Sequence, residues 1–529
     1  MSSVFNNPNV LNDEDEFHVK YGKQIEQVQK YLYNVKEQNQ LQALVVIDTI
    51  QQLGLDRLFH QQIQVILEEQ FLKTKFTPFF DHFDLYEVSL HFRLLRQEGY
   101  SVTAEVFNNF KGENGLFHEE LSQDLKGLMA LHEATHLSIK GESILVEAAQ
   151  FSGECLMRNM VHLDDNQSQK VRQTLQHPIQ KNLPRCSIKS SLENFQVEFE
   201  WEAILKDLAL NEFGKLRSIY NEDLRQVLKW WKELSLTQDL KLARSQPLKW
   251  YMWSMGALSG PTMSKERMEL IKPISLVYVV DDIFDVYGTL PELTLFTEVV
   301  NRWEISAAEQ LPDYMRMCFM TLYETTENTG CVVYKEHGWN PINHLRKAWA
   351  DLCNAFLEEA KWFTSGDMPM AEEYLKNGIV SSGVPMVLIN LYFLLGHGAT
   401  KDSSSSDVLA NIEGIISSIA QILRLLDDLG NAEDEQQEGK DGSYVEYLME
   451  QQGLTNENAR RHVLDMVSNT WNDVNKQCLS PSAIPLSFQK ACLCVARMVP
   501  MMYIYDENHC LPVLEEYIKS IFSDIDGDS

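Results

Sequence analysis

Apolar positions in the first half of the chain recur every three or four residues, which is the spacing of a helix with one buried face. Turn residues separate these periodic stretches, and acidic and basic side chains mix on the polar faces, as on a solvated surface. The pattern predicts helices near residues 18–35, 39–53, 59–72, 86–98, 102–110, 118–128 and 142–150.

A change in pattern divides the chain. Two prolines and weak periodicity between His177 and Ser191 indicate a connecting region, and the next helix begins near Trp201. Few prolines and glycines (16 and 25) among 529 residues fit a helical globular protein that is long enough for two domains. We therefore predict an all-α fold with one domain over residues 1–205 and another over residues 206–529.

The second half contains longer apolar helices. The residues Ser381 to Pro385 interrupt one of them, and Pro385 predicts a kink because proline lacks the amide proton that a helix requires. The longest apolar stretch, Val384 to Leu395, is too short to cross a bilayer, so we expect no membrane span.

Three carboxylates follow the apolar run Leu276 to Val280 within five residues. On a helix, Asp281 and Asp285 project from one face, one turn apart, and Asp282 lies about 100° away. Neighbouring carboxylates on an apolar helix repel each other and resist burial, and Mg²⁺ compensates such pairs well. A helix that emerges into solvent would show the same residues, so this motif alone leaves both readings open.

A second acidic stretch favours the metal reading. Asp427, Asn431 and Glu435 are spaced four residues apart behind another apolar run, so one helical face would carry three oxygen ligands. Arg424 precedes Asp427 by one turn, and a guanidinium suits phosphate oxygens. Two such stripes predict a multi-metal site for an anionic substrate, and no phosphate-binding P-loop motif is present.

Charge and cysteine content limit the binding partners and the cellular compartment that we expect. A net charge of −30 argues against nucleic acid or an anionic membrane as a partner, and it implies that a polyanionic substrate needs metal ions. The nine cysteines form no CxxC pair, which favours a reduced intracellular compartment. Acidic residues 13–16 are wrong for a signal or transit peptide, so we expect a cytoplasmic protein, or a plastid protein if a transit peptide has been removed.

One further motif is typical of a different class of enzyme. His132, Glu133 and His136 form the H-E-x-x-H pattern of zinc proteases. No third histidine follows at the usual spacing, although Glu154 could supply a ligand. A structural helix with hydrogen-bonded histidines is the favoured interpretation.

Over nearly its whole length the chain resembles the plant class I terpene synthases, whose aspartate-rich motif matches residues 281–285. Their second metal motif matches Asp427, Asn431 and Glu435, with Asn431 replacing the usual Ser or Thr. The resemblance implies a helical barrel-like N-terminal domain, a C-terminal class I terpenoid synthase bundle, and three Mg²⁺ ions, with Mn²⁺ as a substitute. It also implies a prenyl diphosphate substrate, bound in part by Asp281, Asp285 and Asp427. We expect a monomer.

Further site residues follow from the same resemblance. Arg244 matches the first arginine of a diphosphate-binding Arg-x-Arg motif, and Gln246 replaces the second. Trp253 matches an aromatic residue that lines the pocket and can stabilise a carbocation, and Arg424 adds a second contact to the diphosphate. Asp506 lies in a stretch that resembles the lid loop over the pocket.

The expected product is an acyclic alcohol. The chain has no arginine before Arg57, whereas most cyclising plant members carry tandem arginines near the N-terminus; with Gln246, this resembles the subfamily that releases linalool or nerolidol. In that mechanism water captures the allylic cation of geranyl or farnesyl diphosphate. The alternatives are a cyclising synthase, a prenyl-chain-elongating transferase, which normally carries a second DDxxD motif, and a helical scaffold without activity.

Overall fold

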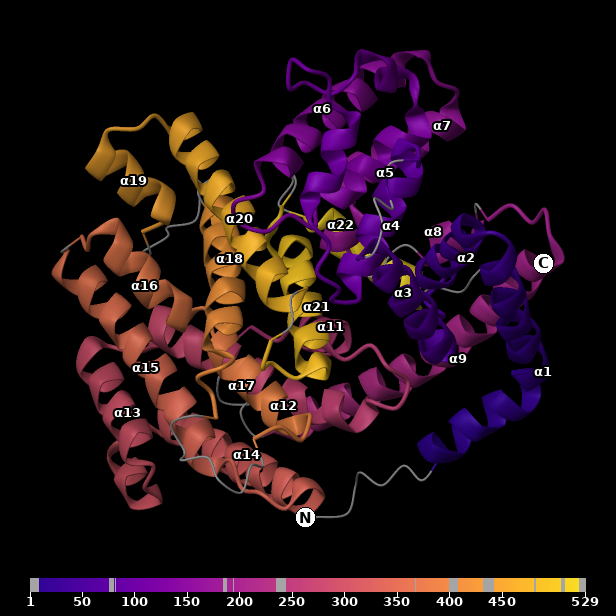
Figure 1. Ribbon diagram of the computed structural model, residues 1–529. Helices are drawn as coiled ribbons and strands as arrows, with labels where there is room; N and C mark the ends of the chain where they lie inside the picture. The colour runs from indigo at the N-terminus through magenta and orange to yellow at the C-terminus, as the bar shows by residue number, and fades with distance from the viewer. Residues whose placement is uncertain are drawn as a thin grey trace. The chain divides into compact units, whose positions relative to one another are not determined.

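The computed structural model (Figure 1) contains helices throughout the parts of the chain that it describes. Within them no strand forms, and an isolated β-bridge joins Lys111 to Phe117. The predicted all-α fold is therefore confirmed. The described residues are 9–75, 80, 82–183, 188–193, 195–234, 244–366, 368–398, 408–431, 442–479, 482–505 and 510–522.

Contacts between Cα atoms divide the chain into two compact units. Among the described residues, the first comprises those up to Arg217 with the short segment Asn475–Ser482, and the second comprises Ser218–Val474 with Ala483–Phe522. The helix α9 (Glu200–Glu233) passes through the predicted boundary near residue 205, which stays a prediction.

The first unit is a set of helices around one large apolar core, in which α4 packs against α2 and α5, and α5 against α6. The core forms because the apolar stripes predicted from the sequence are buried, as with Leu44, Phe92 and Leu145. The helices of this unit are α1 (Asn9–Gln38), α2 (Gln40–Gln52), α3 (His60–Thr74), α4 (Leu85–Gln97), α5 (Leu125–Thr135), α6 (Ser143–Asn159), α7 (Asp165–Gln176) and α8 (Ile188–Glu193).

Two of the helices predicted in this unit are wrong in type or extent. The stretch 102–110 forms a 3₁₀ helix, Ala104–Phe110, and the stretch 118–128 divides into the 3₁₀ helix Glu119–Gln123 and the start of α5. Asp124 causes the division, because its side chain accepts a hydrogen bond from the Gly127 amide and so starts a new helix.

The second unit is a bundle in which α12 packs against α11, α14 and α17, while α18 packs against α16, α17 and α21 (Figure 1). Its helices are α11 (Pro247–Ala257), α12 (Ser264–Asp282), α13 (Leu290–Arg302), α14 (Asp313–His337), α15 (Ile342–Ser365), α16 (Ala371–Ser381), α17 (Val384–Leu394), α18 (Glu413–Asn431), α19 (Tyr444–Gln452), α20 (Asn456–Cys478), α21 (Leu486–Tyr503) and α22 (Pro512–Phe522).

The kink predicted at Pro385 is a complete helix break two residues earlier. Gly383 adopts φ +73°, a left-handed conformation that ends α16, and Pro385 occupies the first turn of α17, where its missing amide costs nothing. A Cβ on Gly383 would lie 2.6 Å from Cγ1 of Val277, so only glycine lets the turn approach α12.

The segment Ala371–Leu394 has the length and mean hydropathy of a membrane span. Most of its apolar window (61%) is buried inside the protein, and Gly383 divides it into two helices. It is therefore a core element of the second unit, which agrees with the expectation of no membrane span.

Candidate active site

A cavity of about 610 Å³ opens within the second unit among α11, α12, α15, α16, α17, α18 and α21. One end carries the predicted carboxylates and arginines, and the opposite walls are apolar. The residues that line these walls include Leu270, Ile274, Val277, Val384, Val387, Leu388, Leu391, Leu423 and Val495.

The end of α12 positions the first carboxylate group. Leu276, Val279 and Val280 are buried, and this fixes the rotation of the helix so that Asp281 lines the cavity. The next five residues, Ile283–Tyr287, form a π-helical turn, which is closed by the Gly288 amide donating to the Ile283 carbonyl at 2.9 Å.

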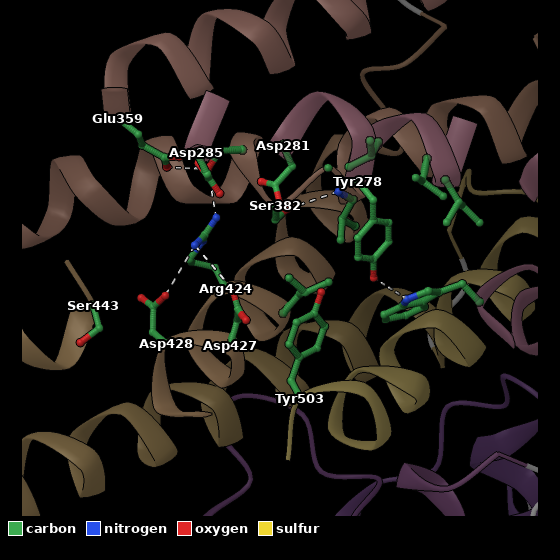
Figure 2. A pocket seen from close by; sticks show the side chains of 18 of the residues that line it. Tyr278, Asp281, Asp285, Glu359, Ser382, Arg424, Asp427, Asp428, Ser443 and Tyr503 are labelled. Atoms are coloured by element: carbon green, nitrogen blue, oxygen red, sulfur yellow. Dashed lines mark hydrogen bonds and ion pairs between the residues drawn. The ribbon is translucent and has the colours of Figure 1, made fainter. Parts of the chain in front are cut away.

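The π turn changes the geometry predicted for the aspartate motif. A regular helix would place Asp285 one turn directly above Asp281, but the wider π turn alters that register. Asp285 nevertheless lines the cavity, and Figure 2 shows its side chain pointing toward Arg424. The two predicted carboxylates therefore share the cavity without the predicted helical spacing.

Asp282 has a different environment. Its carboxylate is buried and accepts hydrogen bonds from the Arg244 amide (2.7 Å) and from Nε of Arg244 (2.6 Å). Arg244 also forms an ion pair with Asp281 through Nη2. Burial alone would lower the pKa of the Arg244 guanidinium, but the charges of Asp281 and Asp282 raise it. Arg244 is thus held as a cation at the edge of the cavity.

Arg424, on α18, lies at the centre of the charged end. Its side chain is 15% exposed, its Nη1 lies 3.7 Å from Asp427 and 3.6 Å from Asp428, and its Nη2 donates to Oγ of Ser381 at 3.2 Å. Figure 2 shows Arg424 among the carboxylates of Asp285, Asp427 and Asp428. This guanidinium offsets much of the negative charge at the carboxylate end of the cavity.

The neighbouring Asp428 was missed by the sequence analysis. It accepts hydrogen bonds from the Tyr444 amide (2.8 Å) and the Tyr374 hydroxyl (3.2 Å). Burial raises its pKa to about 7, against the opposing charge of Arg424. Since both oxygens already have donors, Asp428 supports the wall, and Asp427 is left to face the cavity. The repeated Asp-Asp pair was the available signal.

Glu359 was also missed. Its carboxylate lines the cavity and accepts hydrogen bonds from Oγ of Ser381 (2.6 Å) and Nδ2 of Asn377 (3.1 Å). It lies on α15, far in sequence from both acidic motifs, so no local pattern could have identified it.

The remaining predicted residues divide into two groups. Trp253 lines the cavity, as expected. Asp506 and Glu435 lie outside the described residues, as does the side chain of Asn431, although its backbone ends α18. Gln246, where many relatives have a second arginine, is exposed in front of α11.

The H-E-x-x-H residues lie in the first unit: His132 and Glu133 are on α5, and His136 follows its last residue. Nε2 of His136 lies 3.4 Å from Nε2 of His132, and Nδ1 of His132 lies 3.2 Å from Oγ of Ser152. Glu133 is buried and accepts a hydrogen bond from the Ile179 amide at 2.8 Å. The motif therefore takes part in the packing of this unit.

The donor set suits a hard divalent cation. Asp281, Asp285 and Asp427 supply oxygen ligands only, and Arg244 and Arg424 provide the positive charge that such a crowded anionic end needs. Across the described residues, no three side chains of His, Cys, Asp or Glu converge tightly enough to hold one ion. Mg²⁺ usually retains waters and shares substrate phosphates, so it requires only one or two of these carboxylates at each position.

The fold and the cavity define an all-α enzyme for a substrate that joins an anionic head to an apolar chain. Two family models match the sequence: the N-terminal domain of terpene synthases over residues 2–182, and the metal-binding domain of the terpene synthase family over residues 232–473. The chain belongs to the terpene synthase family, and it is a class I enzyme that acts on prenyl diphosphates. The match to the metal-binding domain confirms the predicted metal cofactor.

Comparison with individual proteins indicates the same family. The chain is 47% identical to a terpene synthase of Ricinus communis (97% of this chain, 89% of the relative). It is 42% identical to an (E)-nerolidol synthase of Cannabis sativa (98% and 97%), and 43% identical to a chloroplastic tricyclene synthase of Antirrhinum majus (96% and 88%). The isoprene synthase of grey poplar, solved with three Mg²⁺ ions and dimethylallyl-S-thiolodiphosphate, is 32% identical with a TM-score of 0.87 (96% and 97%).

Proposed function

We propose that the protein ionises farnesyl or geranyl diphosphate and that water captures the allylic cation to give nerolidol or linalool. The observation that carries this proposal is a cavity that has carboxylates and arginines at one end and apolar walls at the other. The nerolidol synthase relative, which matches over 97% of its length, supports the acyclic product.

We infer that three Mg²⁺ ions act here, as in the poplar isoprene synthase structure, and that Mn²⁺ can replace them. Asp281 at the end of α12 and Asp285 in the π turn after it would hold metal, and Asp427 with Asn431 and Glu435 would hold it from α18 and beyond. Bound Mg²⁺ supplies Lewis-acid stabilisation of the charge that develops on the departing diphosphate.

The protein's own residues perform the remaining tasks. Arg244 and Arg424 donate to diphosphate oxygens, which favours departure because the charge on those oxygens increases as the C–O bond breaks. Trp253 presents an aromatic ring to the apolar part of the cavity, where its quadrupole stabilises a nearby cation. Asp506 is proposed to act at the mouth of the site.

A cyclising reaction is the second candidate, because the tricyclene synthase relative is as similar as the nerolidol synthase. The two functions differ in whether water or a distal double bond reaches the cation first. Gln246 favours early capture by water, because it replaces an arginine that would help to retain the departed diphosphate beside the allylic cation.

Product analysis tests the proposal. The protein is incubated with farnesyl or geranyl diphosphate and Mg²⁺ in ¹⁸O-labelled water, and we expect labelled nerolidol or linalool as the main products. Cyclic hydrocarbons from both substrates would contradict the proposed product and leave the family unchanged. Activity that survives thorough chelation would contradict the metal assignment.

We propose a cytoplasmic monomer that acts on farnesyl diphosphate. The plastid is the alternative location, because the Antirrhinum majus relative is named as chloroplastic. Import of the full-length protein into isolated plastids and its mass in solution would test these two proposals.

A further inference from the structure

Three polar groups interrupt the apolar part of the cavity: the indole N–H of Trp253 on α11 and the hydroxyls of Tyr278 on α12 and Tyr503 on α21. Nε1 of Trp253 donates to the Tyr278 hydroxyl at 3.2 Å, and the two hydroxyls are hydrogen-bonded to each other. Figure 2 shows the two tyrosine side chains approaching from opposite sides, with Asp281 and Asp427 nearby. These groups lie together only in the folded bundle.

The cluster has more donors than its internal hydrogen bonds use. An indole offers one donor and no acceptor, and each hydroxyl offers one donor. The indole N–H and one hydroxyl proton are used within the cluster, since the two tyrosines share one hydrogen bond. One hydroxyl proton is therefore left for a group inside the cavity, whichever tyrosine donates to the other.

The cluster also has acceptor capacity to spare. A hydroxyl oxygen accepts two hydrogen bonds, which gives the pair four positions, of which the indole and the shared bond occupy two. In the described part of the chain, no other partner of these two hydroxyls is seen. A molecule that both accepts and donates, as water does, is the smallest that satisfies such a pair.

The position of the cluster relates it to the charged end of the cavity. Tyr278 precedes Asp281 by three residues, so both side chains lie on neighbouring turns of α12. The Arg244 guanidinium carbon lies 5.5 Å from the centre of the Tyr278 ring, and Nζ of Lys249 lies 5.8 Å from the centre of the Tyr503 ring. A water molecule held here would lie between the diphosphate contacts and the apolar walls.

We propose that the Tyr278 and Tyr503 hydroxyls hold the water molecule that attacks the allylic cation, so that they position the nucleophile for the alcohol product. This inference rests on the proposed function. One tyrosine donates to the water oxygen, the other accepts one of its protons, and a remaining lone pair faces the cation.

The reaction balances without a further reagent. A C–O bond forms between the water oxygen and the tertiary carbon, and the resulting oxonium loses one proton. That proton passes along the hydroxyl pair while each tyrosine gives up its own proton in turn, and the released diphosphate accepts it. No oxidation or reduction occurs, and both tyrosines end neutral.

Single hydroxyl deletions test the proposal through the ratio of alcohol to hydrocarbon products. Without a positioned water molecule, the cation loses a proton to give a hydrocarbon, so Tyr278→Phe and Tyr503→Phe should each lower the ratio by about tenfold. The rate of diphosphate release should fall much less. The ratio counts only molecules that turn over, so partial unfolding lowers the rate and leaves the ratio unchanged.

The matched control is Tyr392→Phe, which deletes a hydroxyl on α17 at a residue that does not line the cavity; its ratio should equal that of the wild type. An unchanged ratio in both tyrosine variants would overturn the inference, as would a loss of diphosphate release with the ratio intact, which would place the hydroxyls on the diphosphate. Wild-type protein that forms no alcohol would overturn the proposed function as well, so the two failures are distinguishable.

Discussion

The aspartates of the first motif should differ sharply in function, although they are adjacent in sequence. Both form ion pairs with Arg244, but Asp281 lines the cavity with a side chain that is 29% exposed, whereas the side chain of Asp282 is 6% exposed and does not line the cavity. We therefore expect Asp281→Asn to remove metal-dependent chemistry and Asp282→Asn to loosen Arg244.

The magnitudes follow from the contacts. Asp282→Asn removes the charge that both Arg244 donors, the amide at 2.7 Å and Nε at 2.6 Å, now meet, and it leaves one of the two facing an NH2 group that cannot accept a hydrogen bond. Such a bond contributes roughly 1.5–3 kcal/mol when it is buried, and because Arg244 is 42% exposed we expect about 1–2 kcal/mol, or about tenfold in rate. Asp281→Asn removes charge from the metal site, which is expected to cost several kcal/mol, or about a thousandfold.

The assay measures diphosphate release against Mg²⁺ concentration, with thermal unfolding recorded for each variant. Asp281→Asn should need more Mg²⁺ and melt like the wild type, whereas Asp282→Asn should keep its Mg²⁺ dependence. The exposed residue Asp313 provides a control, since Asp313→Asn alters a carboxylate that does not line the cavity. Equal losses in both motif variants, with the same Mg²⁺ dependence, would refute the reasoning.

Three further predictions concern separate parts of the molecule. Gly378→Ala should slow diphosphate release about tenfold with little change in melting, because its Cβ would lie 3.0–3.2 Å from three side-chain atoms of Arg424; a wild-type rate would contradict this. If the amide of Asn431 binds metal, Asn431→Ser should stay active and Asn431→Leu should lose about a hundredfold; equal rates would exclude that role. Burial holds the pKa of His132 at about 4 in the folded protein, below the ordinary 6.5, so the wild type loses stability as pH falls from 6.5 toward 4. His132→Gln should spare about 2 kcal/mol of that loss at pH 5, as measured by denaturant unfolding at pH 7 and pH 5, and should leave turnover unchanged; an unaltered acid loss would contradict the shift.

The parts of the site that depend on local periodicity could be predicted from the sequence. Buried apolar residues fix the rotation of α12 and α18, so the spacing of Asp281 and Asp427 behind their apolar runs was enough to predict that both face a common cavity. The fold class was also predictable, because the helical periodicity of the first half and both acidic motifs of the second half each lie within single segments of the sequence.

The parts that depend on contacts between distant segments could not be predicted. The π turn at Ile283–Tyr287 changes the register of Asp285. Its residues include no proline or glycine from which the turn could be predicted. The helix break was expected at Pro385 but lies at Gly383. Glycine is required at that position because Val277 of another helix approaches it closely, and no local pattern shows such a contact. The carboxylate of Glu359 joins the site from α15 only through the packing of the bundle.

The positions of two residues on α12 also bear on the product. Ionisation depends on carboxylates that begin at Asp281, and the proposed water position depends on Tyr278, less than one turn earlier on the same helix. One helical turn rises about 5.4 Å, so a water molecule held at Tyr278 lies close to the place where the diphosphate leaves. The tertiary carbon of the allylic cation is separated from the former C–O bond by a single carbon, whereas the distal double bond must fold back along the apolar walls. Under the proposed arrangement, water therefore has the shorter path to the cation, and an acyclic alcohol follows from where α12 places one hydroxyl relative to one carboxylate.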